Sequence, residues 1–93
     1  MDIIWDPVKA NINLKKHGIS FEEAATVIHS TMSVTIDDDS ISIEQRFVTI
    51  GESVKMRVIM VVHTYRDEEI IRIISARKAT KKEQKIYEER IRL

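Results

Sequence analysis

The sequence predicts an α+β fold with two N-terminal helices, a four-stranded antiparallel β-meander and a C-terminal helix. Helix-start signals stand at Asp6-Pro7, Ser20–Glu23 and Thr80–Glu83. Between the second and third signals, the apolar residues change from helical to strand spacing. The connections between the strand-like runs are short enough for antiparallel neighbours. Because the chain has 93 residues and no linker-like stretch, we expect one domain over residues 1–93.

The N-terminal segment predicts a short strand and a helix. Residues 3–5 form an apolar start that fits an edge strand. Asp6 is a good N-cap, and Pro7 fits the first helical position because its missing N–H is not needed there. The helix is expected to run to about His17, where Gly18 ends it as a left-handed C-terminal cap.

A second helix follows at once. Ser20 and Glu23 form a capping box, and the helix is expected to run to about His29. Its apolar residues at helical spacing are Phe21, Ala24, Ala25, Val27 and Ile28. Since the connection between the two helices is short, we expect them to pack as a helical hairpin.

The second half of the chain predicts the meander and the last helix. The expected strands cover residues 33–36, 45–50, 55–65 and 70–77, with turns at 37–40, 51–53 and 66–69. Residues 41–43 are ambiguous. A capping box at Thr80 and Glu83 opens the last helix, which carries Ile86, Tyr87 and Arg90 at helical spacing.

Composition excludes several classes of protein. The chain has no Cys, which excludes disulfides and thiolate metal sites. No apolar run reaches the roughly 20 residues of a membrane span. The N-terminus lacks the features of a signal peptide, so we expect a cytoplasmic protein without a membrane partner.

Charge is unevenly distributed along the chain. Residues 1–45 carry three Lys and Arg against eight Asp and Glu, and residues 46–93 carry twelve against seven. Such asymmetry is typical of a surface that attracts polyanions, and equally of solvated charge that is unevenly spread.

Metal and cofactor motifs are missing from the sequence. The acidic run Asp37–Asp39 lacks the spacing and the glycine of a calcium loop. The three histidines are far apart, and the two glycines do not form a phosphate loop. We therefore expect no metal and no cofactor.

Five arginines lie in or beside the expected strands: Arg46, Arg57, Arg66, Arg72 and Arg77. A guanidinium is always charged and presents a planar fork to phosphate oxygens. Two interpretations stay open, a groove that follows a nucleic-acid backbone and the outward face of a half-solvated sheet. Arg72 and Arg77 are five residues apart, so they point to opposite faces unless a bulge intervenes.

His17 and the aromatic residues also allow two interpretations each. His17 follows Lys15 and Lys16 in the last turn of the first helix, where the helix dipole favours cations. It is either a group for proton transfer and phosphate binding or an ordinary helix-end cation. Trp5 and Tyr87 fit core packing as well as stacking on a base.

Two sequence blocks point to a known family. The first is Trp5-Asp6-Pro7-x-Lys9-Ala10-x-x-Asn13-x-x-Lys16-His17-Gly18-Ile19-Ser20-Phe21-Glu22-x-Ala24, and the second is Arg72-Ile73-Ile74-Ser75-Ala76-Arg77-x-Ala79. Shorter pieces agree in order: Glu44-x-Arg46, Gly51, Thr64-Tyr65-Arg66, Glu83 and Tyr87. Together they resemble the BrnT family of toxins from bacterial type II toxin–antitoxin systems.

The resemblance implies a RelE-like fold and a metal-independent endoribonuclease that stops translation by cleaving RNA. The nucleophile would be the 2′-hydroxyl of the RNA itself. The partner would be a cognate ribbon-helix-helix antitoxin, and operator DNA would be bound only through that antitoxin.

The resemblance also implies roles for single residues. Arg66 and Arg77 would hold the scissile phosphate, while His17 and Lys16 would assist proton transfer or bind phosphate. The expected substrate-binding residues are Arg46, Trp5, Tyr87 and Glu44. Glu44 fits a general base or an ion-pair partner of Arg46, and we favour the partner.

Two other functions remain compatible with the sequence. One is a non-catalytic module that binds the antitoxin and acts as a co-repressor. The other is a small nucleic-acid-binding domain without a toxin role.

Overall fold

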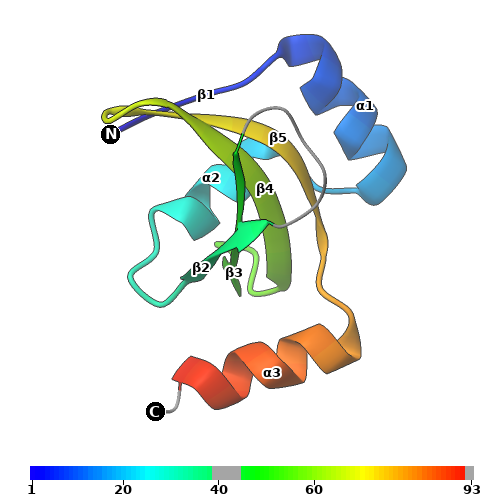
Figure 1. Ribbon diagram of the computed structural model, residues 1–93. Coiled ribbons are helices and arrows are strands. Elements are labelled where there is room, and N and C mark those ends of the chain that lie inside the picture. Colours follow the sequence, from blue (N-terminus) through cyan, green and yellow to red (C-terminus); the bar gives the residue numbers. More distant parts are fainter. Residues whose placement is uncertain (39–44, 92–93) are drawn as a thin grey trace.

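The computed structural model describes residues 1–38 and 45–91, and within them it has an α+β fold with three helices and a five-stranded mixed sheet (Figure 1). The elements are β1 (Asp2–Ile4), α1 (Pro7–His17), α2 (Phe21–Ile28), β2 (Val34–Asp38), β3 (Arg46–Glu52), β4 (Val58–Asp67), β5 (Ile70–Lys78) and α3 (Lys81–Ile91). The strand order is β1-β5-β4-β3-β2.

The expected sheet of four antiparallel strands is wrong in one respect. Strands β2 to β5 form the antiparallel meander, but β1 adds a fifth strand that runs parallel to β5. Its three residues pair from Asp2 with Ile70 to Ile4 with Arg72. The apolar start of the chain is therefore an edge strand, and the sheet is mixed.

Both predicted N-terminal helix starts are confirmed. The Asp6 carboxylate accepts a hydrogen bond from the Val8 N–H at 2.8 Å, and the Ser20 hydroxyl accepts one from the Glu23 N–H at 3.0 Å. Gly18 ends α1 with a φ of 71°, a left-handed conformation that favours glycine. The expected helical hairpin is wrong, because α1 packs on β5 whereas α2 packs on β3, β4 and β5.

The strand boundaries differ from the sequence-based ones at all three hairpins. Asp37 and Asp38, expected in a turn, end β2 as cross-strand partners of Phe47 and Arg46. At the next hairpin, residues 51–52 belong to β3, whereas residues 55–57 lie in the turn. That turn contains Met56 at a φ of 64°, which no strand allows. At the last hairpin, residues 66–67, expected in the turn, belong to β4. Residues 39–44, which include the rest of the expected acidic turn, lie outside the described residues.

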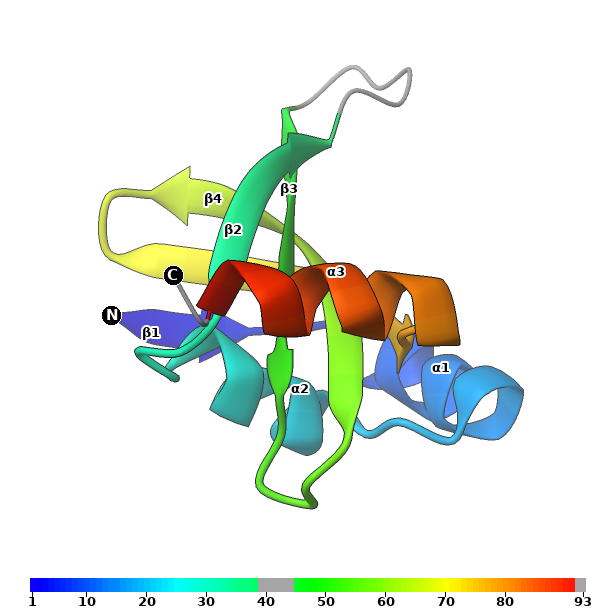
Figure 2. The same cartoon turned by 90° about the horizontal axis from the view of Figure 1, so that it is seen from below.

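The sheet has one largely covered face and one partly covered face. On the covered face α2 packs on the strands, and the core cluster contains Ile19, Phe21, Ala24, Val27, Ile59, Val61, Ile73 and Ala76. The other face, here called the open face, carries Val34, Ile36, Val48, Ile50, Met60, Val62, Ser75 and Arg77. Figure 2 looks onto α3, with α1 and α2 farther back. The C-terminal helix covers only part of the open face.

A β-bulge in β5 decides which arginines share a face. The register passes from Val62 opposite Ser75 to His63 opposite Ile73, so Ile74 is an extra residue. Arg72 pairs with Thr64 and Arg77 with Met60, and these partners lie an even number of residues apart on β4. Both arginines therefore lie on the open face, contrary to strict alternation along the strand.

Two polar clusters lie beneath this framework, one around the buried Glu23 and one around the buried His63. Arg57 donates through Nε and Nη2 to the Glu23 carboxylate at 2.8 and 2.6 Å, and the Ser53 hydroxyl donates to the same carboxylate at 2.7 Å. His63 Nε2 lies 2.7 Å from the Thr49 hydroxyl, which lies 2.7 Å from that of Thr35. The first cluster ties α2 to the β3–β4 hairpin, and the second crosses three strands.

Candidate functional site

A groove runs where α1 meets β5. One hollow of about 120 Å³ is lined by His17, Val48, Met60, Val62, Ser75, Ala76 and Arg77. An adjoining hollow of about 200 Å³ is lined by Lys9, Ile12, Asn13, Lys16, His17, Ile74 and Ser75. His17 and Ser75 line both, so the two hollows form one feature, here called the α1–β5 groove.

One stripe of α1 supplies the polar wall of the groove. Four polar residues of α1 follow one another at steps of four, three and one residues, which places them on one side of the helix. They are Lys9, Asn13, Lys16 and His17. The Asn13 amide nitrogen donates to the carbonyls of Ala76 and Ile19 at 2.9 and 3.0 Å, and the Asn13 oxygen accepts from the Ala76 N–H at 3.1 Å. These bonds hold His17 against β5.

Arg77 supplies the opposite wall and is only partly engaged. Its Nη1 donates to Glu83 and to the Lys78 carbonyl at 2.8 and 3.1 Å, and its Nη2 donates to Glu83 at 2.9 Å. Within the described residues these bonds use three of the five guanidinium N–H groups. The Nε–H and one Nη2–H remain on the lateral edge, a geometry that suits two phosphate oxygens.

Glu83 holds Arg77 in this orientation. The hydrogen bonds from Arg77, followed by the bond from the Thr80 backbone N–H, lower the pKa of Glu83 to about 2. The hydrogen bond to Glu83 also raises the pKa of Arg77 above its ordinary value. Both groups are therefore charged across the neutral range, and α3 begins at a fixed ion pair beside the groove.

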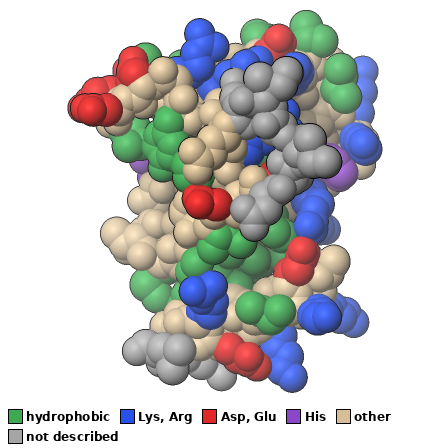
Figure 3. Space-filling view, in the orientation of Figure 1, with side chains coloured by type: hydrophobic (Ala, Val, Ile, Leu, Met, Phe, Trp, Pro, Cys, Tyr) green, Lys and Arg blue, Asp and Glu red, His purple; other side chains and the backbone are tan. Residues whose placement is uncertain are grey.

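The groove combines positive charge with an apolar floor. Lys9, Lys16 and Arg77 carry charge near its rim, and the floor consists of Val48, Met60 and Val62. Figure 3 shows hydrophobic side chains gathered on the sheet face above α3, with Lys and Arg as well as Asp and Glu side chains around them. Such a surface attracts anionic groups that are attached to an apolar body.

Of the four predicted catalytic residues, the structure brings together His17, Lys16 and Arg77 but not Arg66. Arg66 is the extra residue of a second irregularity, between Tyr65 and Asp67 at the far end of β4. Met60, the partner of Arg77, lies six residues earlier on β4, a backbone distance of about 20 Å at about 3.3 Å per residue. Arg66 therefore lies away from the row of Arg77 and lines neither hollow of the α1–β5 groove.

The two predicted aromatic contacts lie outside the groove. Trp5 packs edge-on against Phe21, with ring centroids 6.0 Å apart, and lies against the core cluster. Tyr87 is buried, and its hydroxyl donates to the Met32 carbonyl at 2.8 Å. The sequence allowed either core packing or base stacking for these two rings. Both pack within the protein, and neither lines the groove.

Arg46 lies on the open face but in a different row from Arg77. It pairs across the hairpin with Asp38 and is half-buried. Glu44, the expected ion-pair partner of Arg46, lies outside the described residues, so that pairing stays a prediction.

Sequence reasoning missed three groups that the groove contains. Ser75 lines both hollows, Lys9 extends the positive rim, and Asn13 anchors the helix. The polar spacing along the first helix was a usable signal, because four polar residues share one side of α1. Glu83 was identified only as a capping residue, and its sequence spacing of six from Arg77 gave no sign of the ion pair.

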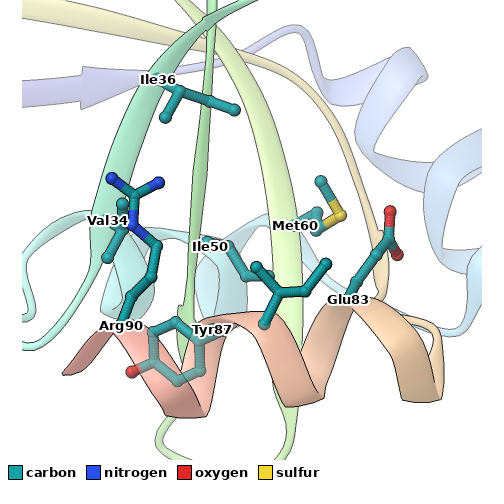
Figure 4. A pocket seen from close by; sticks show the side chains of 8 residues that line it. Val34, Ile36, Ile50, Met60, Glu83, Tyr87 and Arg90 are labelled. Atoms are coloured by element: carbon teal, nitrogen blue, oxygen red, sulfur yellow. The ribbon is translucent and has the colours of Figure 1, made fainter. Parts of the chain in front are cut away.

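A third hollow, of about 140 Å³, lies between the open face and α3. Figure 4 shows Val34, Ile36, Ile50 and Met60 from the strands facing Tyr87 on the helix, with Glu83 and Arg90 at the rim. This hollow is almost entirely apolar and contains no nucleophile.

Two searches of the described residues give negative results. No group of three or more His, Asp or Glu side chains able to hold a metal ion occurs in residues 1–38 and 45–91. No helix in the same part of the chain is long and apolar enough to cross a membrane.

Comparisons with known proteins agree on one family. The model of the family described as "Ribonuclease toxin, BrnT, of type II toxin-antitoxin system" matches residues 5–83. The crystal structure of the Brucella abortus ribonuclease toxin BrnT superposes with a TM-score of 0.70 at 26% sequence identity, over 87% of this chain and 99% of that one. No curated protein sequence matches. Because the family match spans most of the chain and includes both blocks that contribute to the groove, this protein belongs to the BrnT family of ribonuclease toxins of type II toxin–antitoxin systems.

Proposed function

We propose that the protein is a metal-independent endoribonuclease that cleaves RNA at the α1–β5 groove and thereby inhibits translation. The observation that carries this proposal is the free lateral edge of the Arg77 guanidinium in the same hollow as His17. A fork-shaped cation beside an imidazole combines phosphate binding with proton transfer near neutral pH.

The chemistry requires three tasks of the groove. Arg77 and Lys16 bind the scissile phosphate and stabilise the charge that develops on its oxygens. The 2′-oxygen attacks phosphorus, the bond from phosphorus to the 5′-oxygen breaks, and a 2′,3′-cyclic phosphate forms. His17 donates its proton to the leaving 5′-oxygen, and the 2′-hydroxyl proton leaves to solvent. Held cations supply the charge stabilisation that a metal ion supplies in other nucleases.

The partner is an antitoxin, as for toxins of every type II system, and we propose that it is a ribbon-helix-helix protein. Operator DNA would then be bound through the antitoxin alone. The support is the resemblance of the two sequence blocks that also build the groove, Trp5–Ala24 and Arg72–Ala79.

Cleavage of RNA by the purified protein in EDTA tests the enzyme directly. Arg77→Ala and His17→Ala should each slow cleavage by about a hundredfold, the usual loss when one group that stabilises a transition state is removed. Products should end in a cyclic phosphate. Arg66→Ala should mainly weaken binding, because Arg66 lines neither hollow of the α1–β5 groove.

The matched control is Lys85→Ala, which removes an exposed cation from α3. Its melting temperature and that of each active-site variant should stay close to the wild-type value. Undiminished cleavage by folded Arg77→Ala would contradict the site. Cleavage that depends on added divalent metal would contradict the metal-independent mechanism.

A further inference from the structure

The floor of the α1–β5 groove has no task in the cleavage chemistry. Val48, Met60 and Val62 are neighbours on the open face, because the register pairs Val48 with Val62 and places Met60 two residues along β4. All three are half-buried in the described chain. Hydrocarbon therefore faces solvent directly beside the groups that bind phosphate, an arrangement that costs free energy unless a ligand covers it.

Cations flank this floor in both directions along the strands. Arg77 lines the hollow itself. Arg46 lies two residues before Val48 on β3, a distance of about 7 Å along the strand, and Arg72 lies in the corresponding row of β5. Along the strands, a positively charged side chain is thus followed by the apolar floor and then by positive charge again. This order fits a chain molecule in which anionic groups alternate with apolar rings.

The hollow has the size of one ring. Its volume is about 120 Å³, and an engineered apolar cavity of about 150 Å³ in another protein holds a benzene molecule. The hollow also opens at the surface, so a larger ring can extend outward beyond the floor. A base within a duplex presents only its edges, whereas an unpaired base can lay its face on such a floor.

We propose that the floor formed by Val48, Met60 and Val62 is a nucleobase subsite, in which an unpaired base next to the scissile phosphate packs its face on hydrocarbon. The inference rests on the proposed function, and it adds the substrate class: single-stranded RNA that carries a base beside the cleaved bond. An apolar peptide would match the floor but not the cations on both sides of it.

The test uses RNA oligonucleotides with one cleavage position. In two of them, the nucleotide on one or the other side of the cleaved bond is replaced by a reduced abasic unit that keeps the ribose and its 2′-hydroxyl. The wild-type protein should cut one of the abasic oligonucleotides about tenfold more slowly than the intact one, because the abasic unit lacks the ring that would cover the hydrocarbon of the floor.

A floor variant completes the experiment as a double-mutant cycle. Val48→Thr with Val62→Thr keeps the volume and the β-branched shape but makes the floor polar. This variant should cut intact RNA about tenfold more slowly than the wild-type protein does. It should cut the abasic oligonucleotide as fast as the wild-type protein cuts that same oligonucleotide. Val34→Thr, an identical exchange on the same face but in the hollow beneath α3, should leave all rates unchanged.

Each outcome bears on one claim. Cleavage of intact RNA with both abasic oligonucleotides cut equally fast would overturn the base subsite and leave the proposed function standing. A floor variant that slows intact and abasic RNA to the same degree would also overturn it, since the loss would not depend on the base. No cleavage of any RNA would instead overturn the proposed function itself.

Discussion

Asn13 on α1 and Ala76 on β5 exchange two hydrogen bonds, at 2.9 and 3.1 Å, in the way that neighbouring β-strands do. The edge of β5 beyond Arg72 has no strand partner in the described chain, because β1 ends at Ile4. The side-chain amide of Asn13 occupies this edge and satisfies both backbone groups of Ala76. The position of His17, one turn later, depends on that contact.

Replacement of Asn13 by Ala should therefore impair both stability and cleavage. It leaves the buried N–H and C=O of Ala76 without partners, so the free energy of unfolding should fall by about 3 kcal/mol in denaturant titrations. Asn11→Ala, an exposed exchange on the same helix, should change it little. Equal stability of the two variants would mean that the amide contact does not fix α1.

Glu83 limits how strongly Arg77 attracts RNA. Glu83→Gln removes the paired charge while the side chain keeps its shape, so affinity for a non-cleavable RNA should rise about threefold at low salt. The free energy of unfolding should fall by less than about 1 kcal/mol, because both side chains of the pair are partly solvated. Fluorescence anisotropy measures the affinity.

The control for this variant is Glu89→Gln, an exposed position on the same helix with the same change in net charge. Its affinity gain should be smaller than that of Glu83→Gln and should disappear at moderate salt. Equal gains in both variants would show that only net charge matters and that Arg77 is not specifically restrained.

His63 should make stability depend on pH. Burial lowers the pKa of His63 from 6.5 to about 4. Between these two values the unfolded chain binds a proton that the folded chain does not, so stability falls as the pH decreases. Between pH 7 and pH 5 the loss should be about 2 kcal/mol. The free energy of unfolding of His63→Phe, measured in urea, should change little with pH over the same range. A pH dependence equal to that of the wild type would assign the effect to other groups.

The buried carboxylate of Glu23 should be among the most sensitive positions. Glu23→Ala removes the acceptor of the hydrogen bonds from Arg57 and from the buried Ser53 hydroxyl, and should reduce the free energy of unfolding by about 2–3 kcal/mol. The hydrogen bond from Arg57 lowers the pKa of Glu23, so its contribution is present above pH 4.5 and decreases as the pH falls. Glu22→Ala, the exposed neighbour, is the control in thermal melts. Similar melting temperatures for both variants would contradict a structural role for this ion pair.

Much of the fold could be predicted because local signals decide it. The cap at Asp6 and Pro7, the glycine at position 18 and the serine cap at position 20 act within a few residues, and the first helix was predicted with its observed ends. The parallel pairing of β1 depends on a partner almost seventy residues away along the chain, for which a three-residue strand carries no local signal. The hairpin boundaries differed because pairing with β3 holds Asp37 and Asp38 in extended conformation despite their preference for turns.

The candidate site was predictable in its residue types and less so in its geometry. His17, Lys16 and Arg77 came from the sequence blocks, and the groove contains all three. Arg66 appeared close to Arg77 because a hairpin turn separates the strands, but the register places Arg77 of β5 opposite Met60, six residues before Arg66 on β4. Distances along a hairpin cannot be read without the register, and a bulge changes the register by a residue.

The bulge at Ile74 determines which changes of length β5 tolerates. Deletion of the extra residue Ile74 would close the bulge and leave Arg72 and Arg77 four residues apart, a spacing that keeps both on the open face under strict alternation. The loss of one residue can therefore be absorbed at the bulge, whereas the loss or gain of one residue in a regularly paired part of β5 exchanges the two sides of the strand. We expect related sequences that differ in length within β5 to differ at this bulge.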